Sequence, residues 1–398
     1  MIQQLKFILL LSGVGGVFLF FPAFTMLMLS FFTLLCRKKA FFLPMFLFSI
    51  FVAFSQLVLE LNGQEVGDII RYYEYFYDGM SSSYPVSFVR FKLYQGYFFI
   101  LLSGAGLKFN YYGAISTLLL ITFLLIFVYY SLEKMNSQLK TRNQQLVLFL
   151  VFLSFVPFTV FLSFENALSF SIFSLSLVTF ISGNKTLSLL LWGASLAVHN
   201  ATTPLYLILL FSSCSIVDKY RPQIFFAYFI FLFCFVTQFE MLSYLQMDFI
   251  SRVLQKADRY LFGFSFGDIS FIDIGYNILS LLLLLIAYVS LDKTLNCRFF
   301  KNDFLIKYHR FTFLYLCFSS FFILIPTLGG RYIQLGLLFF IPYVFYYLIY
   351  GGGRNKWIVL LLVLILLFSY SNLYFFRSLR LVSFADGQFF YYNLSQLF

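Results

Sequence analysis

Four short segments of the chain carry residues whose types and spacing could do chemistry. The first runs from residue 67 to 78 and contains Asp68, Arg71, Tyr72, Tyr73 and Tyr75. On a helix, spacings of three, four and seven residues from Asp68 place most of these side chains on one polar and aromatic face. Carboxylates and tyrosine rings suit sugar binding. The alternative interpretation is an aromatic belt at a membrane surface, where tyrosine is enriched.

The second segment is Glu165-Asn166, which lies between two apolar runs that are almost free of charge. A polar turn between two helices would explain the pair, because such a turn needs polar residues. A carboxylate at a membrane edge is also a functional candidate by default. We therefore count Glu165 as a candidate general base and Asn166 as a candidate substrate ligand.

The third segment surrounds His199, one of two histidines in the chain, where an apolar run is interrupted just before Pro204. An imidazole here could act as a base, since its pKa lies near neutrality. It could instead hydrogen-bond backbone groups that the interrupted helix leaves unpaired. The other histidine, His309, lies in the basic segment 301–310, and we expect it to be solvated.

The fourth segment is Arg331-Tyr332, which two glycines precede. The planar guanidinium of arginine binds phosphate oxygens in pairs, and glycines allow a close backbone approach, so Arg331 is a candidate ligand of a diphosphate. The alternative is a cation at a helix end that extends to the membrane surface. Arg90 is a weaker candidate of the same kind.

The amino-acid composition indicates whether these segments lie in a soluble or a membrane protein. Hydrophobic residues make up 61% of the 398 residues and charged residues only 11%, whereas about a quarter of a soluble protein is charged. Apolar stretches recur at about the length that crosses the hydrocarbon core of a bilayer. They are apolar on every side, unlike the alternating strands of a barrel. The sequence therefore predicts an all-α protein, a polytopic transmembrane helix bundle.

Ten spans are clear, and two further stretches bring the expected number to about 11 or 12. The stretch 91–107 is short, and we expect it to lie in the interface or to re-enter the membrane. The stretch 186–217 is too long for one helix, and we expect two short helices joined at His199. The ten spans lie near 5–35, 41–60, 111–132, 146–163, 167–182, 223–245, 269–291, 311–328, 332–350 and 357–375.

Charge sets the expected orientation. Basic residues mark cytoplasmic loops, so the cluster at 37–39 is placed inside, and alternation then puts the longest polar loops, 61–90 and 246–268, outside. The whole chain, 1–398, is read as one integral membrane domain whose chemistry faces outward. The net charge of +11 is explained by this rule, and we infer no nucleic-acid partner.

Several other classes of protein lack support in the sequence. The five cysteines are scattered and form no CxxC pair, so neither a disulfide framework nor a metal site is indicated. No phosphate-binding loop of the GxxxxGK[ST] type is present, which argues against an ATPase. We expect no cofactor.

In their order and spacing, these segments resemble the EpsG-type and Wzy-type polymerases of O-antigen, exopolysaccharide and capsule repeat units. The likeness spans most of the chain. It includes the aspartate and tyrosine stretch 68–77, a small-residue helix that ends in a lysine turn at 167–185, the following Leu-Ala-x-His at 196–199, and the late Arg331-Tyr332. One departure is Glu165-Asn166, because the family commonly has an arginine at this point.

The resemblance implies a metal-independent glycosyltransferase of the multispan, GT-C-like class in the bacterial cytoplasmic (inner) membrane, with its active site facing the periplasm or exterior. Its substrate would be an undecaprenyl-diphosphate-linked oligosaccharide, and a chain-length regulator and a flippase would be its partners besides the lipid bilayer. The candidate bases are His199, Glu165 and Asp68. Arg331 and Arg90 would bind the diphosphate.

Two alternatives remain open at this stage. A lipid-linked oligosaccharide flippase has a similar length and number of spans, but it would place charges midway along its helices around a cavity. Here most charges lie at inferred span ends, which favours an enzyme at the membrane surface. An O-antigen ligase-like transferase would share the lipid-linked donor and differ in its acceptor.

Overall fold

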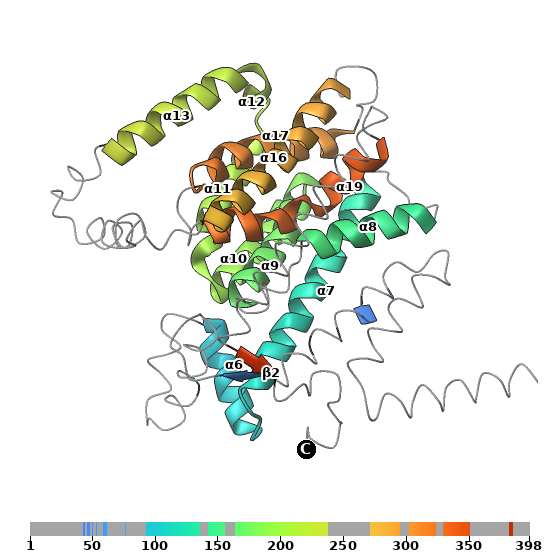
Figure 1. Ribbon diagram of the computed structural model, residues 1–398, viewed down its shortest axis with the longest axis vertical. Coiled ribbons are helices and arrows are strands. Elements are labelled where there is room, and N and C mark those ends of the chain that lie inside the picture. The colour runs from blue at the N-terminus through green and yellow to red at the C-terminus, as the bar shows by residue number, and fades with distance from the viewer. Residues whose placement is uncertain are drawn as a thin grey trace, which may run out of the picture.

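The computed structural model is a bundle of helices (Figure 1). It describes residues 93–135, 142–155, 164–237, 271–294, 302–323 and 329–350, together with two three-residue strands and the single positions 43, 46, 47, 50, 53 and 76. The expected spans at 5–35, 41–60 and 357–375 lie largely outside these residues.

The described helices follow the predicted spans closely. They are α6 (Leu93–Gly104), α7 (Asn110–Lys134), α8 (Arg142–Phe155), α9 (Phe164–Ile181), α10 (Lys185–Val198), η2 (Asn200–Thr202), α11 (Thr203–Ser212), α12 (Ile216–Lys219), α13 (Arg221–Thr237), α16 (Phe271–Thr294), α17 (Asp303–Ser320), η5 (Gly330–Gln334), η6 (Leu335–Phe340) and α19 (Ile341–Tyr350). The strands β1 (Leu59–Leu61) and β2 (Val382–Phe384) pair antiparallel, with Glu60 opposite Ser383. This short pairing is the one departure from the all-helical expectation among the described residues.

Three helical stretches are long and apolar enough to cross a membrane, and they indicate a membrane protein. They are Asn110–Lys134, Phe164–Ile181 and Arg331–Tyr350. Three shorter apolar helices, Lys185–Val198, Asn200–Ser212 and Asn277–Asp292, accompany them. The expected break in the 186–217 stretch is confirmed, since α10 ends at Val198 and α11 begins at Thr203.

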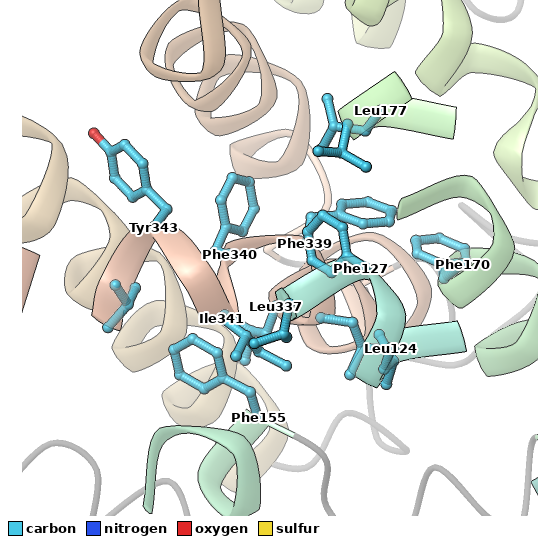
Figure 2. Packing of buried hydrophobic residues seen from close by; sticks show 14 of the residues in the cluster. Leu124, Phe127, Phe155, Phe170, Leu177, Leu337, Phe339, Phe340, Ile341 and Tyr343 are labelled. Carbon is cyan, nitrogen blue, oxygen red and sulfur yellow. The ribbon is translucent and has the colours of Figure 1, made fainter. Parts of the chain in front are cut away.

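Helix α9 lies at the centre of the bundle, and 94% of its 18 residues are buried. Its aromatic face packs against the irregular segment η6, where Phe170 and Phe339 stack with ring centroids 5.3 Å apart (Figure 2). Leu124 and Phe127 of α7 close the same cluster. Rings of this size account for much of the buried apolar area of the core.

Small polar residues join α9 to α10. Ser176 and Ser188 share a hydrogen bond of 2.9 Å, and Ser169 donates to the carbonyl oxygen of His199 at 3.1 Å. In a membrane, small residues let helices approach closely, and hydroxyls hydrogen-bond across the contact. The small-residue character of the 167–182 run therefore reflects its position as the central helix.

The interpretation of His309 as a solvated side chain is wrong. His309 is 2% exposed, its Nδ1 lies 2.7 Å from the hydroxyl of Tyr343, and its Nε2 lies 3.2 Å from Asp292. The ring of Tyr288 stacks on the imidazole with 4.2 Å between centroids. The surrounding basic residues suggested a solvated loop, but α17 begins at Asp303, and its helical period turns this position inward.

Two opposite ends of the bundle can be defined by their contacts. The Glu165 end comprises the first turns of α7 and α9, the turn 199–203 and residues 329–332. The Asp218 end comprises α12, the last turn of α16 and the start of α17, where Asn302 donates to the carbonyl of Lys134 at 2.9 Å. Figure 1 shows α6 at the lower end of α7 and α12 at the upper end of the bundle.

Candidate functional site

Glu165 is a fully buried carboxylate in the first turn of α9. It accepts a hydrogen bond from the hydroxyl of Tyr112 at 2.5 Å, a length typical of a donor that meets a charged acceptor. The alternative of a polar turn between two helices would leave this side chain exposed to water. The neighbouring Asn166 is also buried, with 2% of its surface exposed.

Aromatic side chains of α6 and α9 pack around Tyr112, the hydrogen-bond partner of this carboxylate. The ring of Tyr112 meets Phe164 edge-on at 5.0 Å and Phe99 at 4.9 Å. The hydroxyl of Tyr94 on α6 lies 2.8 Å from Ser116 Oγ, one helical turn after Tyr112. Neither Tyr112 nor Tyr94 is among the residues predicted from the sequence, although a tyrosine at the start of a predicted span is a signal of an interfacial site.

His199 ends α10 and begins the short turn that leads into α11. Its backbone is extended, and its Nδ1 accepts a hydrogen bond from the N–H of Ala201 at 3.1 Å. The side chain thereby caps the 3₁₀ turn Asn200–Thr202, and Ser195 and Thr202 share a further hydrogen bond of 2.8 Å beneath it. The imidazole thus satisfies a backbone donor at the helix break, as the structural alternative predicted.

Tyr332 ties a third segment to this turn. Its hydroxyl donates to the carbonyl oxygen of Ala201 at 3.0 Å, and its ring stacks on Phe322 with centroids 4.9 Å apart. Arg331, the residue before it, is half-buried in the π-helical turn η5. The tyrosine therefore fixes the position of the arginine relative to the His199 turn.

Glycines shape this irregular segment. A Cβ on Gly329 would lie 2.5 Å from Nδ2 of Asn277 and 2.8 Å from the carbonyl oxygen of Phe322, so this glycine allows the chain to pack closely against these two residues. A Cβ on Gly336 would overlap the hydroxyl of Tyr315, which donates to the carbonyl of Tyr332 at 2.5 Å. Gly336 thus lets Tyr315 bind a carbonyl that an α-helix would satisfy itself.

The structure brings together five of the ten residues that the sequence singled out. Glu165, Asn166, His199, Arg331 and Tyr332 come from three segments far apart in the sequence and lie at the same end of the bundle. The remaining candidates lie outside the described residues: Asp68, Arg71, Tyr72, Tyr73 and Arg90. Within the described part of the chain, no group of three or more His, Cys, Asp or Glu side chains could hold a metal ion.

Comparison with known proteins returned no relative. No protein-family model matches the chain, and neither the curated proteins nor the solved structures that were searched contain a significant match. The helical fold, its membrane-length apolar helices and the convergence at the Glu165 end are therefore the findings on which a function must rest.

Proposed function

We propose that the chain is a polymerase of undecaprenyl-diphosphate-linked oligosaccharide repeat units, acting at the outer face of the bacterial cytoplasmic membrane. The observation that supports it is the convergence of three sequence-distant segments at one end of the bundle. Ser169 of α9, the helix that carries Glu165, and Tyr332, the residue after Arg331, each donate a hydrogen bond to a backbone carbonyl of the His199 turn. A carboxylate that can act as a base and a cation that can stabilise the leaving diphosphate are the groups that such a glycosyl transfer uses.

The proposed reaction transfers a glycan from one lipid carrier to the next unit. The attacking hydroxyl oxygen of the acceptor bonds to the anomeric carbon of the donor, and the bond from that carbon to the diphosphate oxygen breaks. The proton of the hydroxyl goes to Glu165. Undecaprenyl diphosphate leaves with the electron pair, and a cation must stabilise its developing charge.

Glu165 is the base that the described geometry favours. Its carboxylate is buried, where electrostatic interactions are stronger than in water, and the Tyr112 hydroxyl fixes its orientation. The hydrogen bond from Tyr112 is also an example of a hydroxyl group bound by this carboxylate, as the acceptor hydroxyl would be. Arg331 is assigned to the diphosphate because its planar guanidinium can bind two oxygens at once.

The full architecture belongs to the same proposal. We assign about 11 to 12 spans, a GT-C-like arrangement and an outward-facing site, with loops 61–90 and 246–268 on the site's side of the membrane. The chain-length regulator and flippase that the resemblance implies would be its partners.

The deciding experiment is deletion of the gene in its host, followed by electrophoresis of the surface polysaccharide. We expect the ladder of long chains to disappear while a single repeat unit is retained. Loss of all surface glycan would instead indicate a flippase or a ligase and overturn the proposal.

A second measurement tests the chemistry. Purified Glu165→Gln should transfer the glycan about 10² to 10⁴ times more slowly, the usual contribution of a general base. Tyr112→Phe, which removes only the hydroxyl that orients the carboxylate, is the matched control and should retain more activity. Equal rates for wild type and Glu165→Gln would exclude Glu165 as the base.

A further inference from the structure

Two buried polar side chains near Glu165 have no hydrogen-bond partner among the described residues. Gln95 on α6 is fully buried, and neither its Oε1 nor its Nε2 is paired. Thr117 on α7 is also fully buried, and its hydroxyl is unpaired. Leaving such groups unsatisfied is costly, and each one in a native fold requires an explanation.

Both side chains occupy the same level of the bundle as Glu165. The hydrogen bond between Tyr94 and Ser116 fixes α6 against α7, and Gln95 and Thr117 are the residues that follow these two. Ser116 in turn lies one helical turn from Tyr112, the partner of Glu165. Gln95 also shares its face of α6 with Phe99, whose ring contacts Tyr112.

Several other hydroxyls of these helices are paired with backbone carbonyls. Thr122 on the same helix donates to the carbonyl of Leu118, four residues earlier, at 2.8 Å. On α9, Ser171 and Ser174 donate in the same way to carbonyls three residues earlier. Such bonds are the usual solution for hydroxyls inside a helix. Thr117 makes no such bond within the described part of the chain.

The chemistry of this level matches a neutral sugar. The amide of Gln95 and the hydroxyl of Thr117 can each donate and accept, as the hydroxyls of a sugar ring require. The rings of Tyr94, Phe98 and Tyr112, with centroids 5.2 to 5.8 Å apart, form an aromatic cluster at the same level of the bundle. A diphosphate would instead need cations.

We propose that Gln95 and Thr117 bind hydroxyls of the acceptor sugar, the ring that carries the attacking hydroxyl, next to Glu165. This inference rests on the proposed polymerase function and adds the subsite that selects the acceptor. A buried amide and hydroxyl of this kind would discriminate strongly between acceptor sugars, because a sugar that lacks the matching hydroxyl would leave the two protein groups unpaired.

The test uses the purified full chain in nanodiscs, with an undecaprenyl-diphosphate-linked repeat unit isolated from a strain that lacks the gene. Gln95→Met and Thr117→Val keep the side-chain size and remove the polar atoms. We expect each to raise KM about tenfold, a change equivalent to about 1.4 kcal/mol, with kcat within about threefold of wild type. Their melting temperatures should be unchanged or higher, because a buried unpaired group is removed.

The matched control is Ser131→Ala, which removes another unpaired buried hydroxyl of α7, near the other end of that helix. It should leave KM unchanged. Unchanged KM for Gln95→Met and Thr117→Val, or a lower melting temperature without a change in KM, would overturn the subsite and leave the polymerase proposal standing. If Gln95→Met does not fold, Thr117→Val decides alone. Absence of polymer from wild-type protein would instead reject the polymerase function, and the subsite with it.

Discussion

At the scale of single residues, the hydrogen bonding of His199 constrains its chemistry. Because its Nδ1 accepts the N–H of Ala201, the neutral ring carries its proton on Nε2. Nε2 is then a donor, and the nitrogen that would take a proton is occupied by the backbone. His199 is therefore better suited to hold the turn than to deprotonate an acceptor hydroxyl.

This assignment predicts that His199→Asn is tolerated. The Oδ1 of asparagine lies the same number of bonds from Cα as the Nδ1 of histidine, so it can still accept the Ala201 N–H. We expect melting temperature and polymerisation rate to stay near wild type, with an unchanged pH profile from pH 5.5 to 8. His199→Ala should lose about 1 kcal/mol of stability, the usual value of a cap. A rate drop of about 10² or more in His199→Asn at matched folded protein would restore the role of His199 as the base.

Arg331 gives a second prediction at this scale. If its guanidinium binds two diphosphate oxygens, Arg331→Lys keeps the charge but loses the planar pair of donors. Both Arg331→Lys and Arg331→Ala should then shorten the polymer strongly in complemented cells, as measured on polysaccharide gels. Lys307→Ala is a suitable control, since that cation lies at the Asp218 end and pairs with Asp303. Full polymer length with Arg331→Lys would show that a simple helix-end charge suffices.

At the scale of elements, ion pairs attach α12 and α13 to the rest of the bundle. Arg221 binds Asp218 at 2.7 Å and Asp292 of α16 at 2.6 Å, while Arg310 of α17 binds Asp218 at 2.6 Å. Figure 1 shows α13 extending away from the other helices beyond this junction. The contact of Tyr228 with the carbonyl of Phe318, at 3.0 Å, supports α13 farther along.

The pKa of Asp218 shows how this junction responds to pH. Partial burial alone would raise the pKa, but hydrogen bonds and charges from Arg310 and Arg221 outweigh it and lower the pKa below its usual value of 3.8. Because the folded-state pKa is depressed, the stabilisation is present above the unfolded value and is lost as the pH falls through the folded value. The junction is therefore expected to be unaffected between pH 5 and 8.

A double-mutant cycle with Asp218→Asn and Arg310→Gln measures this attachment. We expect a coupling of about 0.5 to 1 kcal/mol in detergent unfolding, because Asp218 is 34% exposed and water screens the pair. The control cycle uses Asp303 and Lys307, whose ion pair of 2.6 Å lies within α17 alone. A smaller coupling is expected there. Equal couplings in both cycles would mean that the junction adds nothing beyond a surface pair.

The sequence predicted elements well where local pattern determines them. The helix break at His199 follows from an apolar run too long for one helix and from Pro204, both of which are local signals. The burial of His309 was missed because its partners, Asp292 and Tyr343, lie 17 and 34 residues away. The irregular segment 330–340 likewise depends on the contact of Tyr315 with Gly336, which helical periodicity does not reveal.

At the scale of the whole molecule, the two ends of the bundle differ in their charged residues. Helices α9 and α10 run antiparallel, so the turns at 182–184 and 199–202 lie at opposite ends. Ion-paired arginines gather at the Asp218 end, while the buried carboxylate and the proposed site lie at the other. From this arrangement the positive-inside rule predicts that the Asp218 end faces the cytoplasm.

Cysteine labelling tests this orientation on the whole chain. Three single-cysteine variants are compared. One carries Asn200→Cys in the exposed turn at the Glu165 end, one keeps the native Cys214, which is exposed at the Asp218 end, and one keeps the native Cys317. An impermeant maleimide added to spheroplasts should label position 200 at once and Cys214 only after the membrane is opened. The buried Cys317 serves as the control and should stay unlabelled until the protein is denatured. The polymerase proposal needs this order, because its lipid-linked substrate is exposed only on the outer leaflet. Labelling of Cys214 before position 200 would place the site in the cytoplasm and remove the outward-facing mechanism altogether.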